Sequence, residues 1–172
     1  MVFTGRYAAD VEDDFVVFLI GMRFNKPWHV RGWWHTFTSM RPMIEELQEH
    51  PELGLLHAQL GWIGGPAVVQ YWRSFAHLDR YARNAEHLHL PAWKKWNRAS
   101  RASGAVGIWH ETYQVRAGEY EAIYGNMPRT GLAVAGGHVP LTAKGRSAAR
   151  RIGATEQDVP AVAYPGDEAM PV

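Results

Sequence analysis

The spacing of apolar residues predicts strands and helices in the first half of the chain. The run Phe15–Met22 is continuously apolar and rich in β-branched and aromatic residues, which is typical of a strand whose sheet is covered on both faces. Residues 36–50 place apolar side chains three or four positions apart, so they are predicted to form an amphipathic helix ended by Pro51. Residues 53–62 and 67–72 are predicted strands, joined by a Gly-Gly-Pro turn.

The second half of the predicted core repeats the change from helix to strand. Ser74 is the expected N-cap of a second helix, which ends at Asn84. Pro91 suits the first turn of a further helix, because its missing N–H has no partner to lose there. Residues 104–116 alternate and are rich in strand-forming residues, which predicts the last core strand, and a short segment follows at 120–124.

This order of elements predicts an α+β fold of the ferredoxin-like kind, β-α-β-β-α-β. In that arrangement the helices cover one face of a four-stranded antiparallel sheet. The first strand is apolar on both faces, so the second face also needs a cover. A second copy of the chain, packed face to face in a two-fold symmetric homodimer, would supply it and close a dimeric α/β barrel.

Composition agrees with one globular domain and a distinct C-terminal segment. The chain has 172 residues, of which 47% are hydrophobic and 20% charged. Residues 131–172 contain few large apolar side chains, several Gly and Pro, and the basic stretch Lys144–Arg151. We therefore expect a dimeric α/β-barrel domain at residues 1–130, with its core at about 10–127, followed by an extended, partly ordered tail.

Charge and cysteine content exclude several classes of protein. Eighteen Lys and Arg against 17 Asp and Glu leave a formal charge of +1, which argues against a nucleic-acid partner. The absence of Cys excludes disulfides, thiolate catalysis, Cys-ligated zinc and iron–sulfur clusters, so the nine His are the strongest metal ligands. The longest apolar run is far shorter than the roughly 20 residues that span a bilayer, and acidic residues precede it, so we expect a cytoplasmic protein without a membrane partner.

Five sequence blocks resemble a known enzyme family. They are similar to the signature blocks of the polyketide monooxygenase-like family related to a fumagillin-pathway enzyme, and the resemblance covers about residues 14–140. The blocks are GMRFNKPW (21–28), QYWRSF (70–75), HLHLPAW (87–93), GIWHETY (107–113) and YEAIYGNMP (120–128).

The family in turn is similar to the dimeric α/β-barrel superfamily. That superfamily includes antibiotic-biosynthesis quinol monooxygenases, haem-degrading monooxygenases, chlorite dismutases, dye-decolourising peroxidases and haem-containing aldoxime dehydratases. The resemblance therefore implies the fold that the order of elements predicts. It implies no single reaction, because one fold hosts unrelated chemistries.

His87 and His89 are candidate ligands or acid–base groups at the junction of two predicted helices. The resemblance implies such a role, because haem-binding relatives place an axial His on a helix that faces the sheet. Residues two apart on a helix do not share a face, so at most one of the pair points into a cavity between helices and sheet. Glu86 is a candidate acceptor for the second ring nitrogen. The alternative is that one His caps a helix and the other is solvated.

His110 and Glu111 are adjacent on the last predicted strand, so they should point to opposite faces of the sheet. Both faces are expected to be largely dry, and buried polar groups need partners. His110 is therefore a candidate general base or second ligand. The alternative is a structural pair that stabilises the sheet or the dimer.

The end of the first predicted strand is rich in hydrogen-bond donors. Arg23, Asn25 and Lys26 together suit a carboxylate, a propionate or a reduced oxygen species. Monooxygenases of the superfamily use an Asn on the first strand, and Asn25 is the nearest counterpart, displaced toward the strand end. The alternative interpretation is a polar turn.

Aromatic residues supply enough ring surface to line a pocket for a flat, hydrophobic ligand, although core packing is the alternative for each of them. The candidates for the pocket wall are Tyr71, Trp72, Trp93, Trp96 and Trp109. The sequence contains no GxGxxG, GxxxxGK, GxSxG or HExxH motif.

Three functions remain open at this point. The first is a monooxygenase-like oxidoreductase that acts on a hydrophobic or aromatic, polyketide-like small molecule in a cavity between helices and sheet. In cofactor-free oxygenases of the superfamily a deprotonated, electron-rich phenol itself reduces dioxygen, so no cofactor is required. The second is a haem enzyme with a His axial ligand, either an oxygenase or an aldoxime-dehydratase-like lyase. The third is a non-catalytic dimeric module that binds a small ligand.

Overall fold

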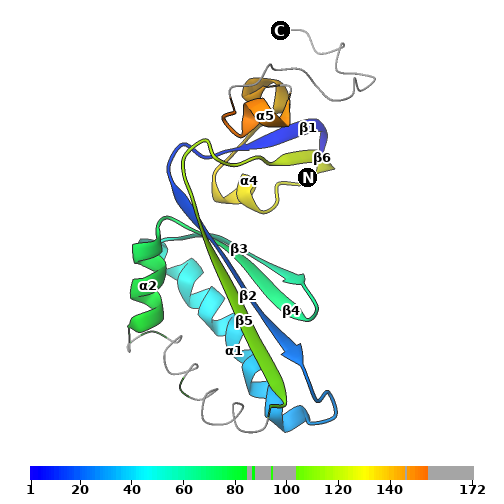
Figure 1. Ribbon diagram of the computed structural model, residues 1–172, viewed down its shortest axis with the longest axis vertical. Helices are drawn as coiled ribbons and strands as arrows, with labels where there is room; N and C mark the ends of the chain where they lie inside the picture. The colour runs from blue at the N-terminus through cyan, green and yellow to red at the C-terminus, as the bar shows by residue number, and fades with distance from the viewer. Residues whose placement is uncertain (85–86, 88–93, 95–103, 146, 155–172) are drawn as a thin grey trace.

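The computed structural model describes residues 1–84, 87, 94, 104–145 and 147–154. Its strands form two antiparallel sheets, one of four strands and one of three (Figure 1). The elements in chain order are β1 (Phe3–Asp10), β2 (Phe15–Phe24), α1 (Val30–Glu49), the 3-10 turn η1 (Pro51–Leu53), β3 (Leu55–Trp62), β4 (Pro66–Trp72), α2 (Phe75–Arg83), β5 (Val106–Val115), β6 (Ile123–Met127), α4 (Leu132–Ala135), β7 (Gly137–Pro140), the 3-10 turn η2 (Leu141–Lys144) and α5 (Ala148–Arg151).

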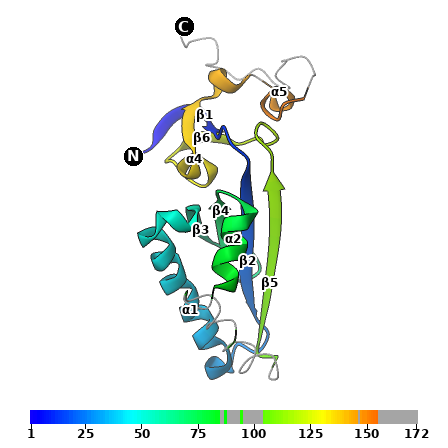
Figure 2. The same cartoon turned by 90° about the vertical axis from the view of Figure 1, so that its left-hand side faces the viewer.

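The large sheet has the predicted ferredoxin-like topology. Its strand order is β3-β4-β2-β5, every neighbouring pair is antiparallel, and α1 lies between β2 and β3 in the chain and α2 between β4 and β5. Both helices pack on one face of this sheet (Figure 2). We call the other face the open face. The prediction of an α+β fold with this order of elements is confirmed.

Helix α1 is longer than the predicted helix at residues 36–50. It starts at Val30 and contains Pro42. The additional first turns are held by contacts with the segment just before the helix, since the ring of Trp33 packs 4.7 Å from that of Phe24 and its indole N–H donates to the carbonyl of Pro27 at 3.0 Å. Gly and Trp are weak helix formers, so local propensity alone did not reveal these turns.

The turn between β3 and β4 is tight, as the Gly-Gly-Pro sequence predicts. Gly64 has φ +65°, a left-handed conformation that favours glycine, and Ile63 N–H donates to the carbonyl of Gly65 at 2.8 Å. A Cβ on Gly65 would overlap the backbone carbonyl of Met22. This glycine therefore lets the hairpin approach β2 closely.

The small sheet was not predicted. Its order is β6-β1-β7, and both of its outer strands pair antiparallel with β1. Strand β1 carries Ala8 and Ala9, each only 2% exposed, which are too small to give a clear apolar periodicity. Strand β7 has only four residues, which is too short for a clear strand pattern in the sequence. It pairs with β1, more than 120 residues away in the chain.

Residues 131–154 differ from the extended tail that the sequence predicts. They form α4, β7, η2 and α5, and Leu132, Ala133 and Leu141 are buried. Both ribbon views show α4 between the two sheets (Figures 1 and 2). The physical reason is that the few apolar residues of this segment pack against β1 and the large sheet. The expected domain boundary at residue 130 stays a prediction.

A second apolar cluster joins the two sheets. Ala9, Phe15, Leu132 and Ala133 are its buried members, and Tyr71 packs against them. Phe15 and Tyr71 belong to the open face, so residues of this same chain cover the upper part of that face. A second copy of the chain is therefore not needed there.

His138 lies in an aromatic cluster of the small sheet. Its ring stacks on Tyr7 with 4.5 Å between centroids, and the rings of Phe3 and Tyr124 contact it edge-on. In the described part of the chain, neither ring nitrogen of His138 has a hydrogen-bond partner. Burial, with a smaller effect of Arg129, lowers the pKa of His138 below its usual value.

None of the helices formed by the described residues combines the length and the apolarity that crossing a bilayer requires.

Candidate functional site

A cavity of about 530 Å³ lies between the two helices and the large sheet. Its volume falls in the range of roughly 300–1,000 Å³ that small-molecule sites occupy. Helix α1 contributes Met40, Met43 and Ile44 to the wall, and the floor includes Phe18 and Ile20 of β2. The lining is mainly apolar, so the cavity suits a hydrophobic ligand.

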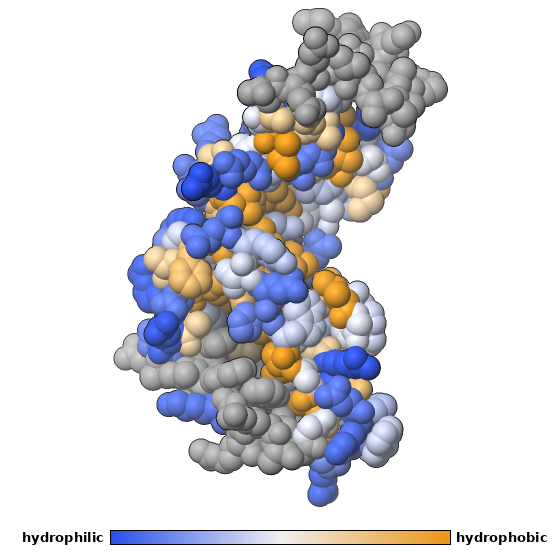
Figure 3. Space-filling view, viewed as in Figure 1, coloured by the Kyte–Doolittle hydropathy of each residue, from blue (hydrophilic) through white to orange (hydrophobic). Residues whose placement is uncertain are grey.

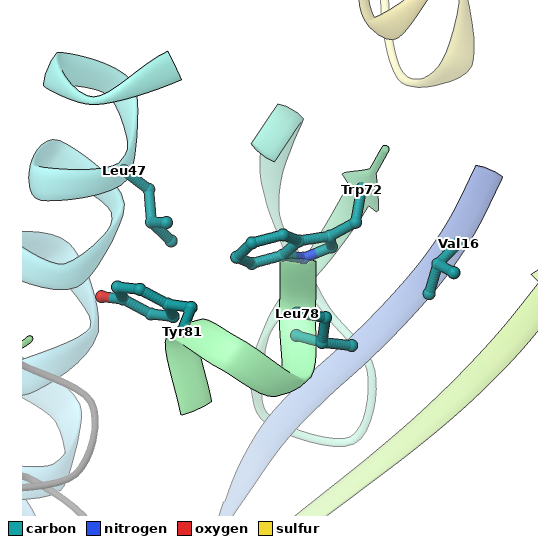
Figure 4. Close-up of a cluster of buried hydrophobic side chains, with 5 residues drawn as sticks. All are labelled: Val16, Leu47, Trp72, Leu78 and Tyr81. Atoms are coloured by element: carbon teal, nitrogen blue, oxygen red, sulfur yellow. The ribbon is translucent and has the colours of Figure 1, made fainter. Parts of the chain in front are cut away.

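Five buried residues form a core cluster beside this cavity, and four of them, all except Val16, also line it (Figure 4). Trp72 is the largest of them and is 1% exposed. Its indole N–H donates to Oε1 of Gln70 at 2.8 Å. The cluster consists of Val16, Leu47, Trp72, Leu78 and Tyr81, which come from β2, α1, β4 and α2.

Polar side chains on the floor come from two strands of the large sheet. Gln70 of β4 is 5% exposed, and His110 and Thr112 of β5 line the cavity beside it. In the sheet register Phe18 lies opposite both Gln70 and Thr112, and Ile20 lies opposite His110. Strand alternation therefore presents all three polar groups to the same side.

His110 and Glu111 point to opposite faces, as predicted, because His110 lines the cavity and Glu111 is the next residue of the strand. His110 is exposed, so the expectation that it is largely dry on the helix-covered face is wrong. The reason is that β5 is an edge strand of the large sheet. Glu111 is exposed in the single chain, and its burial against a second copy stays a prediction. On the open face Glu111 accepts a hydrogen bond from the hydroxyl of Tyr113 at 2.6 Å.

Two helices bring further polar groups to the cavity that the sequence analysis did not single out. On α1, the hydroxyl of Ser39 donates to the carbonyl of His35 at 2.6 Å, and both residues line the cavity. On α2, Asp79 and Arg83 form an ion pair at 2.7 Å at the cavity wall. Helical spacing brings each of these pairs together, which is the sequence signal that could have found them.

His87 is held by a carboxylate from α1. Its Nδ1 lies 3.2 Å from Oε1 of Glu46, and the hydroxyl of Tyr81 donates to Oε2 of the same carboxylate at 2.7 Å. Burial and the Glu46 carboxylate raise the pKa of Tyr81. The partner that the structure gives His87 is thus Glu46, 41 residues away, whereas the expected acceptor Glu86 lies outside the described residues, as does His89.

His87 does not line the cavity. Its ring lies 5.2 Å from that of Tyr81, which does. The structure therefore places His87 beside a residue of the cavity wall and outside the lining itself.

Arg23 and Asn25 lie at the far end of β2, away from the cavity lining. Arg23 is exposed and lies opposite Gly107 of β5. Gly107 is two residues from Trp109, so alternation places the side chain of Arg23 on the open face. The amide of Asn25 lies against Gly107, and its backbone N–H donates to the carbonyl of Ala105 at 3.0 Å. The structure does not bring these residues together with His110.

The predicted aromatic wall is divided between the two faces of the sheet. Trp72 lines the cavity, whereas Tyr71 and Trp109 lie on the open face, because neighbouring residues of a strand point to opposite sides. The indole of Trp109 covers Gly21 so closely that a Cβ there would lie 2.6 Å from the ring. The expectation that these three line one pocket is therefore wrong. Trp93 and Trp96 lie outside the described residues.

Tyr71 belongs to the contact between the two sheets. A Cβ on Gly131 would lie 3.1 Å from its hydroxyl oxygen. Burial and the nearby Tyr124 raise the pKa of Tyr71. The backbone N–H of Leu132 has a weaker effect in the opposite direction. Nearby, Gln59 accepts hydrogen bonds from Thr130 and from the backbone of Gly131, both at 2.9 Å, which fastens the segment before α4 to the open face.

Two solved structures resemble the chain at low sequence identity. One is a dimeric protein of unknown function with a ferredoxin-like fold from Bacteroides fragilis, with TM-score 0.43, 13% identity, and coverage of 58% of this chain and 95% of that one. The other is a protein from Shewanella oneidensis, with TM-score 0.41, 11% identity, and coverage of 64% of this chain and 98% of that one.

Sequence comparison identifies the family. A curated relative, Monooxygenase af470 from Aspergillus fumigatus, is 32% identical over 123 residues, or 64% of this chain. The chain spans only about two fifths of the length of that relative, since the match covers 42% of it. Residues 15–132 match the family described as Monooxygenase af470-like, which confirms the predicted resemblance. Because this match extends over more than half of the chain, the protein belongs to the monooxygenase af470-like family.

Proposed function

We propose that the protein is a monooxygenase-like oxidoreductase that binds a hydrophobic, aromatic, polyketide-like small molecule between its helices and its large sheet. The observation that carries the proposal is the apolar cavity of about 530 Å³, whose floor holds an imidazole and a buried amide. Family membership supports the reaction class.

His110 is the proposed general base. Its imidazole lines the cavity, and in the described part of the chain its ring nitrogens have no hydrogen-bond partner. An imidazole within hydrogen-bond reach of a phenolic hydroxyl acts as a general base by accepting its proton as the reaction proceeds. Because β5 is an edge strand, the proton can then pass to solvent.

The rest of the proposed reaction uses the electrons of the substrate. For 1-naphthol as a simple probe, one oxygen atom of O₂ enters the ring and the other leaves as water, which yields 1,4-naphthoquinone. The probe supplies all four electrons, so this balance requires no further reductant. The apolar walls formed by Phe18, Met43 and Leu78 would hold the rings and exclude water.

Haem is the alternative cofactor, and the described residues do not fit it with His87 as axial ligand. The contact between His87 Nδ1 and Glu46 is one that a ligating imidazole often makes. However, His87 is not part of the cavity lining, and its ring lies beside that of the lining residue Tyr81, with 5.2 Å between centroids.

A homodimer is part of the same proposal. The lower part of the open face carries Leu19, Val69 and Trp109, which are half-buried, and Tyr113, which is 50% exposed. Figure 3 looks onto the molecule from this side and shows hydrophobic positions over the large sheet, between polar ones. Burying these residues against a second copy is favourable, at about 25 cal/mol per Å² of apolar surface.

Oxygen uptake and absorbance of the purified protein test the proposal. We expect a protein without a Soret band that consumes oxygen with 1-naphthol and forms 1,4-naphthoquinone. His110→Gln should reduce the rate at least tenfold, whereas His29→Gln, at an exposed position outside the cavity, should not. Binding of 1-naphthol without oxygen uptake would contradict the oxygenase and favour the binding module. A Soret band that appears with added hemin and requires a His would favour the haem enzyme.

A further inference from the structure

The amide of Gln70 is an unusual group in the floor of the cavity. It lies on β4, an inner strand of the large sheet, and the residue is 5% exposed. Its neighbours across the sheet are Phe18 on one side and Ala58 on the other, and neither side chain offers a hydrogen-bond acceptor. A buried amide in such surroundings needs a partner for its N–H groups.

Trp72 determines which way this amide points. An indole N–H can only donate, so it must pair with the oxygen of the amide, and it lies 2.8 Å from Oε1 of Gln70. Nε2 of Gln70, with its two N–H donors, therefore faces away from Trp72. Within the described residues Nε2 has no hydrogen-bond partner.

The unpartnered nitrogen borders open space rather than packed side chains. Among the described residues, only the ring nitrogens of His138 are side-chain polar atoms that are fully buried and have no hydrogen-bond partner. Nε2 of Gln70 also has no partner but is not one of these atoms, so it is accessible to solvent, and Gln70 lines the cavity. A ligand in the cavity can thus supply the missing acceptor.

We propose that Gln70 recognises an acceptor oxygen, a carbonyl or a phenolate, on the ligand of this cavity, and that Trp72 is a positioning residue that fixes the amide. The inference rests on the proposed function, because it assumes that the cavity holds the substrate. It adds a substrate class, namely aryl ketones and hydroxylated aryl ketones.

The position of His110 extends this inference. Gln70 and His110 are on β4 and β5, which flank β2, and they lie opposite Phe18 and Ile20, two residues apart on that strand. Two strand spacings and a two-residue offset put their backbones roughly 12 Å apart. A two-ring ligand lying over Phe18 and Ile20 would span this distance. Its carbonyl would then meet Gln70 while a hydroxyl at its other end meets the general base.

A pair of matched probes tests the role of Gln70. 2-Acetylnaphthalene carries a carbonyl, and 2-isopropenylnaphthalene replaces that oxygen by a methylene group of similar size. Equilibrium dialysis measures the dissociation constant of each probe for the wild type and for Gln70→Glu, which keeps an acceptor for Trp72 but removes the N–H donors. We expect the ketone to bind the variant roughly tenfold more weakly, and the hydrocarbon to bind both proteins equally within about twofold.

Two further variants complete the test. Gln70→Met is an uncharged replacement of similar length, used if the carboxylate of Gln70→Glu prevents folding, and it should show the same selective loss. Gln59→Glu lies on the open face and should leave both probes unaffected. Trp72→Phe removes the indole N–H, and it should weaken the ketone more than the hydrocarbon.

The outcomes separate the two proposals. If the wild type binds neither probe, the cavity is not the ligand site and the proposed function fails. If the wild type binds both probes but the variants weaken both equally, Gln70 has only a structural role. If the ketone binds Gln70→Glu and Gln70→Met as tightly as it binds the wild type, the assignment of Gln70 is overturned while the proposed cavity stands.

Discussion

Leu132→Ala tests whether residues after 130 are part of the folded core. Leu132 opens the short helix α4 and is 7% exposed, in the cluster that also contains Phe15 and Ala133. The variant removes its buried branched side chain from the contact between the two sheets. If residues after 130 formed an extended tail, the variant would not change the free energy of unfolding. If Leu132 packs between the two sheets, the variant lowers that free energy.

The expected magnitude follows from burial. Replacing a buried Leu by Ala lowers the free energy of unfolding by about 2–5 kcal/mol, depending on how far the surroundings collapse. Leu132 belongs to a helix of only four residues, which can move inward, so we expect about 2–4 kcal/mol. For a chain of this size each kcal/mol shifts the Tm by roughly 2–4 °C, so the Tm should fall by about 5–15 °C.

Urea denaturation followed by far-ultraviolet circular dichroism measures this loss at a fixed protein concentration. Val134→Ala is the matched control, since Val134 lies on the same helix and is 42% exposed. It should change the free energy of unfolding by no more than about 0.5 kcal/mol. Equal effects of Leu132→Ala and Val134→Ala would refute the packing of α4 against the sheets.

Three further predictions concern other parts of the molecule. Gly65→Ala should destabilise the protein by about 1–3 kcal/mol in urea titrations, because its Cβ overlaps a backbone carbonyl, whereas Gly61→Ala meets open space and should have little effect. Burial lowers the pKa of His138 in the folded chain below its usual 6.5, so at acidic pH the unfolded chain binds more protons than the folded chain does. Stability should be fully present above about pH 6.5 and fall as the pH is lowered from there, and His138→Phe should make that fall shallower; an unchanged pH profile would contradict this. Leu19→Asp should lower the mass measured by sedimentation from dimer to monomer, unlike Leu60→Asp at a 73% exposed position, and a monomeric wild type would rule out the proposed dimer.

Local patterns were enough to predict the large sheet and its two helices. The apolar run of β2, the amphipathic spacing in α1 and the N-cap Ser74 of α2 are signals within a few residues of each other, and the structure contains each element. Ser74 accepts a hydrogen bond from the backbone of His77, as an N-cap should. The blocks that resemble the monooxygenase family likewise lie in short contiguous segments.

The candidate site was only partly predictable. Alternation along a strand correctly separated His110 from Glu111, and it also separates Tyr71 from Trp72. The register between β4, β2 and β5 decides that Trp109 too lies on the far side of the sheet from Trp72. Deciding which set faces the helices requires knowing which face α1 and α2 cover. A strand that is apolar on both faces does not contain that information.

The order of elements and the family follow from short-range sequence patterns, because strand and helix periodicities repeat over distances that one segment contains. Contacts between segments far apart in the chain follow only from the tertiary structure. Glu46 meets His87 across 41 residues, and Tyr120 donates to the carbonyl of Val11 across 109. Such pairs, the small sheet and the burial of Leu132 depend on how whole elements pack, since the side chains that meet there share no local repeat from which their partnership could be inferred.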